Sequence, residues 1–225
     1  MKKIIKKLIK VLRWKYLKFR VAIASVIHKQ KRIKKGLFID GGSNLGQGYS
    51  FFRKYFPEDC FDVLFIEPNP NCMRVVKNKF RNIENSDFLQ KAIWVKEDKL
   101  NFFGLVEDDR GNTSSGGSVV DNHNSSMYQS NKEKALSVDA FSFSDLLAIK
   151  SKTYNKIIVK MDIESAEYEV LKDLIDKNTI TKIDHLFVEF HSQYFNKIEQ
   201  PIYQKLEKEI IKSIKSKGVG LTQWI

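Results

Sequence analysis

Short apolar runs alternate with amphipathic segments along most of the chain. The apolar runs predict strands at residues 37–39, 62–66, 88–95, 100–106, 136–138, 157–161, 185–190 and 219–225. Apolar residues at helical spacing predict helices at residues 47–56, 70–81, 143–149, 164–176 and 201–216. Apolar strands that alternate with helices are typical of a parallel sheet that is covered on both faces. The pattern therefore predicts an α/β domain over residues 36–225, with a doubly wound, mostly parallel sheet.

The first 35 residues follow a different pattern and contain neither glycine nor proline. Their apolar residues recur at helical spacing: Ile5, Leu8, Leu12, Phe19, Ile23 and Ile27. Lysines fill the gaps, which predicts a basic amphipathic helix in an arm over residues 1–35. With Trp14 and Tyr16 this helix could lie at a membrane–water boundary, or it could pack its apolar stripe on the domain. A secretory signal is disfavoured, because the apolar stretch 21–27 is short and follows densely charged residues.

The net charge of +12 is a property of this arm. Residues 1–35 hold 14 lysines and arginines and no acidic residue, whereas the rest of the chain holds 25 basic and 27 acidic residues. This asymmetry indicates an anionic partner for the arm, such as an anionic membrane surface. No apolar run is long enough to span a membrane, and two cysteines exclude a disulfide framework and a four-cysteine zinc site. We expect a cytoplasmic protein, peripheral on the inner face of the membrane if the arm binds lipid.

One long polar segment interrupts the predicted domain. Residues 107–134 are rich in serine, asparagine, glycine and aspartate and show almost no apolar periodicity. A structureless stretch of this length inside a compact domain is usually a functional loop or a disordered one. We interpret the segment as a lid over the substrate, with disorder as the alternative.

The strongest motif lies where the first strand of the domain is predicted to end. Residues 38–46, Phe-Ile-Asp-Gly-Gly-Ser-Asn-Leu-Gly, lead from a strand through a glycine turn into a helix, where backbone N–H groups are free to bind a ligand. Asp40 would repel a phosphate but attract an ammonium group. Glu67, at the end of the next predicted strand, could accept both hydroxyls of a ribose. A ribose and an ammonium group without a pyrophosphate suit S-adenosylmethionine better than NAD.

Five motifs, in this order along the chain, resemble those of FkbM-type methyltransferases. The motifs are Phe38–Gly46, Phe65–Pro70, Lys91–Ile93, Val159–Glu167 and Phe187–His191. The most specific of them is Lys-x-Asp-x-Glu-x-Ala-Glu at residues 160–167, and the resemblance leaves out the arm. The resemblance implies a class I methyltransferase fold, S-adenosylmethionine as cofactor, and O-methylation of a sugar or another small polar acceptor. Ser165 departs from the family, which generally has glycine there.

The resemblance also implies roles in the cofactor site. The residues that would hold the methionine moiety are Asp40, Gly41, Gly42, Ser43, Asn44 and Gly46. Glu67 would bind the ribose, and Ala92 and Ile93, at the end of the third predicted strand, would lie against the adenine.

Four polar residues follow two of the predicted strands. Asp162 and Glu164 alternate after one strand, and Glu189 and His191 alternate at the end of the next, so both pairs are expected at the carboxyl edge of the sheet. An alcohol acceptor must lose a proton, and His191 is the natural base near neutral pH, with Asp162 as its rival. Alternatively, His191 only forms a hydrogen bond with the backbone. The four side chains could also hold Mg²⁺ or Mn²⁺, although we expect a site without a metal.

Two other functions are compatible with the sequence. The basic arm would suit an RNA methyltransferase, but the rest of the chain is slightly acidic, so nucleic acid is the less favoured partner. A membrane-docked scaffold without catalysis is favoured only by Ser165. The leading prediction is an O-methyltransferase for a sugar, a nucleotide-linked sugar or another small polar acceptor, in bacterial glycan or capsule biosynthesis. An oligomer is compatible with the sequence, which does not specify the acceptor.

Overall fold

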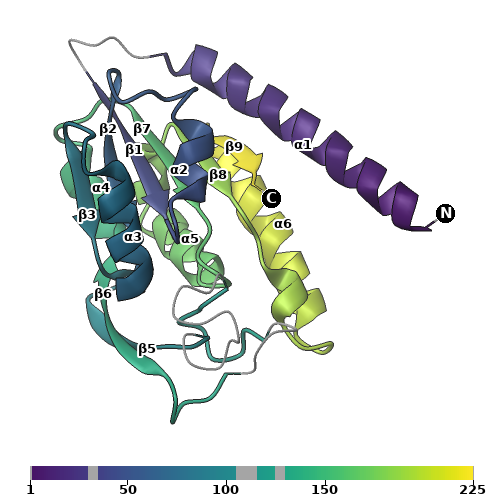
Figure 1. Ribbon diagram of the computed structural model, residues 1–225. Helices are drawn as coiled ribbons and strands as arrows, with labels where there is room; N and C mark the ends of the chain where they lie inside the picture. Colours follow the sequence, from purple (N-terminus) through teal and green to yellow (C-terminus); the bar gives the residue numbers. More distant parts are fainter. Residues whose placement is uncertain (1, 30–34, 105–115, 125–129, 225) are drawn as a thin grey trace.

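The computed structural model describes residues 2–29, 35–104, 116–124 and 130–224, with side chains from residue 7 onward. Six strands form one parallel sheet in the order β3-β2-β1-β7-β8-β9 (Figure 1). Their bounds are Gly36–Gly41 for β1, Phe61–Ile66 for β2, Ser86–Leu89 for β3, Ile157–Met161 for β7, His185–Val188 for β8 and Gly220–Gln223 for β9. The order reverses between β1 and β7, and such a switch point is where open α/β sheets bind ligands.

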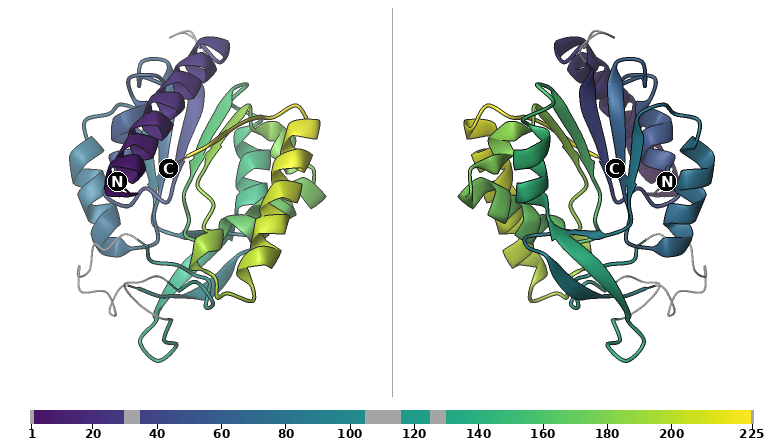
Figure 2. Two further views of the ribbon diagram at one scale, coloured as in Figure 1. Left: turned by 90° about the vertical axis from the view of Figure 1, so that its right-hand side faces the viewer. Right: turned by 90° about the vertical axis from the view of Figure 1, so that its left-hand side faces the viewer.

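Helices cover both faces of this sheet, as the two side views of Figure 2 show. On one face lie α1 (Lys2–Ile27), α2 (Gln47–Phe52) and α3 (Pro70–Phe80). On the other face lie α4 (Phe143–Lys150), α5 (Glu167–Asp176) and α6 (Gln200–Ser216), with the short 3₁₀ helices η1 (Thr179–Lys182) and η2 (Ser192–Tyr194). Alternate residues of β1 point to opposite faces of the sheet. Phe38 packs in the core cluster on one face, and Leu37 and Ile39 pack in the cluster on the other. The prediction of a doubly wound α/β fold of the class I methyltransferase type is confirmed.

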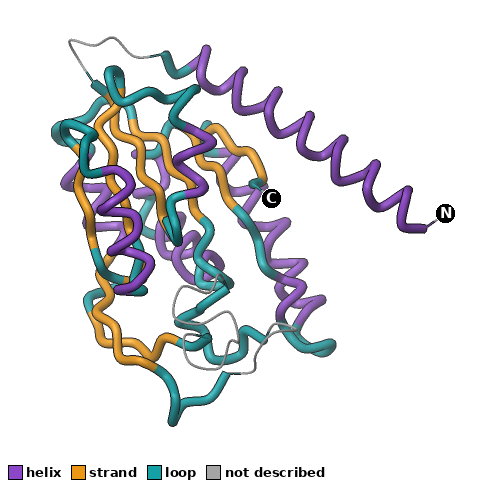
Figure 3. The backbone as a smooth tube through the Cα atoms, viewed as in Figure 1, coloured by secondary structure: helices purple, strands orange, loops and turns teal. Residues whose placement is uncertain are grey.

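A second sheet was not predicted. It has three strands in the order β4-β6-β5, with bounds Ala92–Trp94 for β4, Asp98–Phe102 for β5 and Leu136–Ser142 for β6. The single strand predicted at 88–95 is therefore wrong: its first half pairs with β2 and its second half, past Lys91, pairs with β6. In Figure 3 this second sheet lies below the main sheet, beside the loops at the ends of the main strands.

Around the predicted catalytic residues, β7 ends where predicted, β8 ends two residues earlier than predicted and α5 begins three residues later. The strand β7 ends at Met161 and β8 at Val188, so the four predicted polar residues all lie beyond the strands. The helix α5 begins at Glu167 rather than at 164, because Glu164 and Ser165 have left-handed φ angles of 51° and 77° that a right-handed helix cannot contain. Each polar pair therefore extends from a strand end into the loop beneath the sheet.

The helix α1 packs on the fold, but with a stripe that the sequence pattern did not single out. The buried residues are Leu17, Val21 and Ala24, and Trp14 contacts the ring of Trp224 beside them. The apolar positions that defined the predicted stripe are exposed instead: Leu8, Leu12, Phe19, Ile23 and Ile27. None of the described helices is both long and apolar enough to cross a membrane.

Candidate active site

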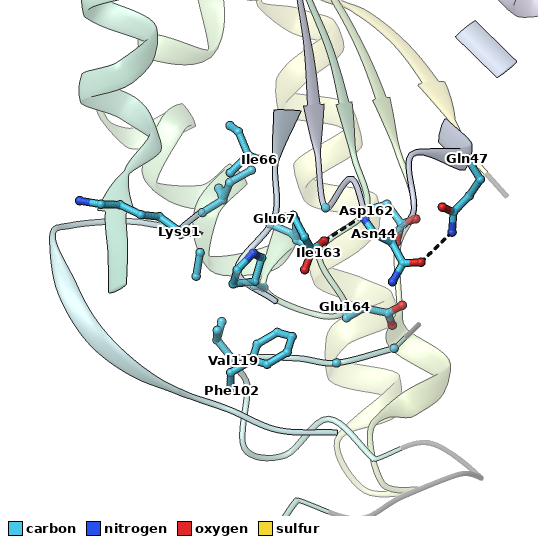
Figure 4. Close-up of a pocket in the computed structure, with 17 residues that line it drawn as sticks. Asn44, Gln47, Ile66, Glu67, Lys91, Phe102, Val119, Asp162, Ile163 and Glu164 are labelled. Carbon is cyan, nitrogen blue, oxygen red and sulfur yellow. Dashed lines mark hydrogen bonds between the residues drawn. The ribbon is translucent and has the colours of Figure 1, made fainter. Parts of the chain in front are cut away.

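A pocket opens at the switch point, where β1, β2 and β7 end (Figure 4). It encloses about 650 Å³, part of it open to solvent. The predicted cofactor and catalytic residues that line it are Gly42, Asn44, Glu67, Ala92, Ile93, Asp162 and Glu164. Residues from the main sheet, the second sheet and the polar segment therefore meet at one cavity.

The turn after β1 brings the backbone against the loop that follows β7. Gly42 has a φ of 69°, and a side chain there would collide with the backbone carbonyl of Asp162. The turn is fixed by Ser43, whose backbone N–H donates to the carbonyl of Ile66 and whose hydroxyl donates to the carbonyl of Asp40 at 2.7 Å. Gly42 can therefore be only glycine, because it combines a left-handed conformation with close approach of two loops.

Glu67 presents its carboxylate to the pocket while nearly buried, at 6 % exposure. One oxygen accepts the backbone N–H of Asn44 at 2.8 Å, and the other accepts that of Asn69 at 2.9 Å. Burial raises the pKa of Glu67 to about 7, although these two N–H donors oppose the shift. The predicted ribose-binding residue thus lies on the pocket wall, held in one orientation by the loops after β1 and β2.

Asp40 occupies a different place from the one predicted. Its side chain is fully buried behind the turn, where it lies 3.3 Å from the ammonium of Lys160 and accepts the backbone N–H of Tyr49. Burial raises the pKa of Asp40, and Lys160 opposes that shift. Three other residues predicted around the methionine moiety also lie outside the pocket lining: Gly41, Ser43 and Gly46. The carboxylate of Asp40 therefore forms an internal ion pair with Lys160, and it does not line the pocket where it was predicted to attract a ligand's ammonium group.

The apolar end of the pocket includes residues that the sequence did not indicate. Ala92 and Ile93 were predicted there, but Phe102 comes from β5 of the second sheet. Val119 belongs to the polar segment predicted as a lid (Figure 4). The described parts of that segment are residues 116–124 and 130–134, and the first of them contributes to the pocket wall. Residues 105–115 and 125–129 lie outside the described part of the chain, so the predicted lid is placed only in part.

Beside the pocket, four acidic side chains surround the imidazole of His191. Its Nδ1 lies 3.1 Å from a carboxylate oxygen of Glu167, which also accepts the backbone N–H of His191. Its Nε2 lies 3.6 Å from Asp162, 3.5 Å from Glu164 and 4.0 Å from Glu189. The structure therefore brings all four predicted catalytic residues together around one ring, and adds Glu167, which sequence reasoning left without a role.

The charges in this cluster decide which group can accept a proton. Burial alone would lower the pKa of His191, but the charge and hydrogen bond of Glu167, with the charges of Glu164 and Asp162, raise it to about 10. Burial, reinforced by neighbouring carboxylates, raises the pKa of Glu164 and that of Glu189 to about 7. The raised pKa favours a protonated imidazole at neutral pH, so this geometry does not support the prediction that His191 is the base, and the carboxylates are the better candidates.

The same side chains offer ligand atoms at a spacing that a metal ion could use. Atoms of Asp162, Glu164 and His191 lie within 4.8 Å of one another. A metal ion at these atoms would have to displace the proton on Nε2 of His191, which three neighbouring carboxylates favour.

A second hollow borders another member of the cluster, Glu189. Its lining includes Glu189, Gln193 and Glu207 from the body of the protein and Arg13 from α1. Asp162 and Glu164 border the first pocket and Glu189 borders this second hollow, while His191 contacts all three carboxylates. Members of the cluster therefore border two hollows.

The chain resembles known methyltransferase sequences over most of its length. The sequence profile described as Methyltransferase FkbM domain matches residues 40–218, most of the chain. The chain belongs to the FkbM methyltransferase family. A solved structure, methyltransferase FkbM from Methylobacillus flagellatus KT, is 12 % identical with a TM-score of 0.45; the match covers 77 % of this chain and 37 % of that one. A search of curated proteins returns no match.

Ser165, where the resemblance to the FkbM family led us to expect glycine, has an unusual backbone conformation. The residue has a φ of 77°, a conformation in which glycine is unstrained and other residues are rare. Its hydroxyl lies 2.7 Å from Nδ1 of His123, a buried residue of the polar segment. The serine therefore keeps the backbone that glycine would adopt, and it gains a hydrogen bond that ties the segment to the site.

Proposed function

We propose that this FkbM family protein is an S-adenosylmethionine-dependent O-methyltransferase for a sugar or another small polar acceptor. The observation that carries the proposal is the buried carboxylate of Glu67 in the pocket at the switch point. Each of its oxygens accepts one backbone N–H and has a further lone pair. A ribose offers two adjacent hydroxyl donors, which match two adjacent carboxylate oxygens.

The charges and apolar surface of the pocket also fit this cofactor. Three carboxylates line it, those of Glu67, Asp162 and Glu164, whereas Lys91 is the one lysine or arginine among the described lining residues. This balance favours a ligand with a sulfonium and an ammonium group over one with a pyrophosphate. Phe102 and Val119, together with Ala92 and Ile93, provide an apolar surface for a flat adenine ring.

When bound, the cofactor supplies a methyl group on a positively charged sulfur. The chain's own residues must hold an acceptor hydroxyl beside that methyl group and take its proton as the carbon–oxygen bond forms and the carbon–sulfur bond breaks. Glu189 faces the second hollow, and its pKa of about 7 suits a base at neutral pH. His191, held by Glu167, contributes a positive charge that keeps Asp162 and Glu164 in place.

The acceptor is proposed to be an alcohol rather than a phosphate-rich polymer. The carboxylates of Asp162, Glu164 and Glu189 all lie within 4.0 Å of Nε2 of His191. Such a group of carboxylates repels phosphates but accepts hydrogen bonds from hydroxyls. This supports a sugar acceptor over RNA, and a sugar acceptor would in turn suit glycan biosynthesis.

The proposal is tested by incubating the protein with methyl-labelled S-adenosylmethionine and separate pools of sugars, nucleotide-linked sugars and RNA. We expect label in alkali-stable methyl ethers of a sugar pool. Asp162→Asn should abolish most of this transfer, whereas Asp139→Asn, an exposed residue of β6, should retain it. Label in the RNA pool alone, or no transfer to any alcohol by a protein that binds the cofactor, would contradict the proposal.

A further inference from the structure

The helix α1 carries two apolar stripes, and the protein uses only one of them. The inner stripe, Leu17, Val21 and Ala24, is buried against the core. The outer stripe is Leu8, Leu12, Phe19, Ile23 and Val26, all exposed. Of the 14 exposed large apolar residues among the described side chains, nine lie on α1. So much apolar surface on one helix is unusual for a face that meets only water.

The spacing of the outer stripe places it opposite the packed side. Successive members are separated by three, four or seven residues, so they fall on one face of the helix. Phe19 follows the buried Leu17 by two residues, which turns it about 200° around the helix axis. Phe19 is 62 % exposed and Val26 is 75 % exposed. In Figure 1 the N-terminal part of α1 extends away from the body of the protein. Nearer the other end of the helix, Phe19 and Ile23 border a hollow that they share with His185 of β8.

Cations accompany this outer stripe along the helix. The exposed basic residues among the described side chains of α1 are Lys7, Lys10, Arg13, Lys15 and Lys18. Four of these lysines line a hollow over Val11 and Trp14. Residues 1–35 contain no acidic residue that could neutralise them. The helix α1 thus combines an exposed apolar stripe on its outer face with unbalanced positive charge around the rest of its surface.

We propose that the outer face of α1 docks the protein on an anionic membrane surface, with the helix lying in the plane of the interface. Lipid acyl chains would cover the outer stripe, and the flexible lysines would reach the anionic headgroups from beside it. The charge selects this occupant over the others. A second copy of the chain would bring two acid-free, lysine-rich helices together, and an RNA backbone would leave the outer stripe facing water.

Docking in this way would also place the candidate active site beside the membrane surface. This consequence rests on the proposed function. Arg13 of α1 lines the same hollow as Glu189, so the acceptor side of the catalytic cluster lies beside the docked helix. An acceptor held at the membrane surface, such as a sugar carried by a lipid, could reach the cluster without leaving the interface.

Co-sedimentation of the full chain with vesicles tests the docking without requiring activity. Vesicles of phosphatidylcholine alone are compared with vesicles that contain about 30 % phosphatidylglycerol. We expect at least ~10-fold more protein bound to the anionic vesicles, with binding reduced at about 0.5 M salt, where charge attraction is screened. The triple variant Leu12→Ser/Phe19→Ser/Val26→Ser should lose most of this binding. The matched control is Ile149→Ser/Ile198→Ser/Ile202→Ser, which alters equally exposed apolar residues of the body and should bind as the natural chain does.

A second variant keeps the test informative if the apolar changes disturb the fold. Lys7→Gln/Lys10→Gln/Lys15→Gln/Lys18→Gln changes only exposed side chains and should abolish the preference for anionic vesicles. Thermal melting of each variant confirms that it is folded. Unchanged binding of both α1 variants would overturn the proposal. A dimer in sedimentation velocity that is lost in the apolar variant would also overturn it. Tight RNA binding by a chain that does not bind vesicles would do the same.

Discussion

Replacement of Glu189 by glutamine should lower turnover by about two to four orders of magnitude, the usual contribution of a general base. The glutamine keeps the size of the side chain but cannot take the acceptor's proton. Cofactor affinity should change little, because Glu189 lies outside the lining of the cofactor pocket. Steady-state kinetics with a labelled methyl donor measure the first effect, and calorimetry measures the second.

The pH dependence of turnover also tests whether Glu189 is the base. A carboxylate base works when it is ionised, so the rate of the natural chain should rise with pH through about 7, the pKa to which burial and Asp162 raise Glu189. Glu164 titrates in the same range, so the observed value belongs to the pair. Glu207→Gln, in the same hollow, is the matched control and should retain turnover within tenfold, that is about 1.4 kcal/mol. A Glu189→Gln enzyme that matches this control would remove Glu189 from the role of base.

Replacement of Lys160 by methionine should destabilise the fold by about 3–5 kcal/mol. The lysine is 3 % exposed, lies 3.3 Å from Asp40 and 3.5 Å from Asp162, and donates to the backbone carbonyl of Gly42 at 2.7 Å. Methionine fills much of the same space but leaves Asp40 as a buried carboxylate without its cation. Urea unfolding of the natural chain and the variant measures the loss.

Two comparisons distinguish the loss of this buried ion pair from the general effect of removing a lysine. Lys156→Met removes the partner of Asp184 just before β7, but both side chains are about a quarter exposed, so its cost should be about 0–1 kcal/mol. In Lys160→Met, burial holds the pKa of Asp40 above its unfolded value, so the folded state opposes ionisation and the variant loses stability as pH rises above about 4. The deficit should therefore be larger at pH 8 than at pH 5. Equal deficits for both lysine variants would show that Asp40 does not depend on Lys160.

The main sheet, and the edge of it that carries the site, could be predicted from the sequence. Apolar strands and the polar residues that follow them are patterns among residues that are close together in the chain. Glu67 lies on the pocket wall as predicted, since the residue after a parallel strand emerges at the carboxyl edge. The role of Asp40 could not be derived in this way. Its partner Lys160 is 120 residues away in the chain, and the two are opposite each other only through the register of β1 with β7.

Other features depended on the same kind of distant contact. Phe102 joins the pocket through the second sheet, which pairs strands on either side of the polar segment. The pKa of His191 departs from its ordinary value because Glu167, at the start of α5, meets the loop after β8. In α1, both apolar stripes have helical spacing, so periodicity alone could not show that Leu17 and Val21 would face the core.

The most direct test of the account is the binding of S-adenosylhomocysteine, measured by titration calorimetry. The natural chain should bind it, and Glu67→Ala should lose about 2–4 kcal/mol of binding free energy, because two hydrogen bonds to a carboxylate are removed. Glu84→Ala, which changes an exposed glutamate before β3, should bind as the natural chain does. Equal affinity of Glu67→Ala and the natural chain would contradict the ribose assignment, and no binding by the natural chain would contradict the proposed cofactor.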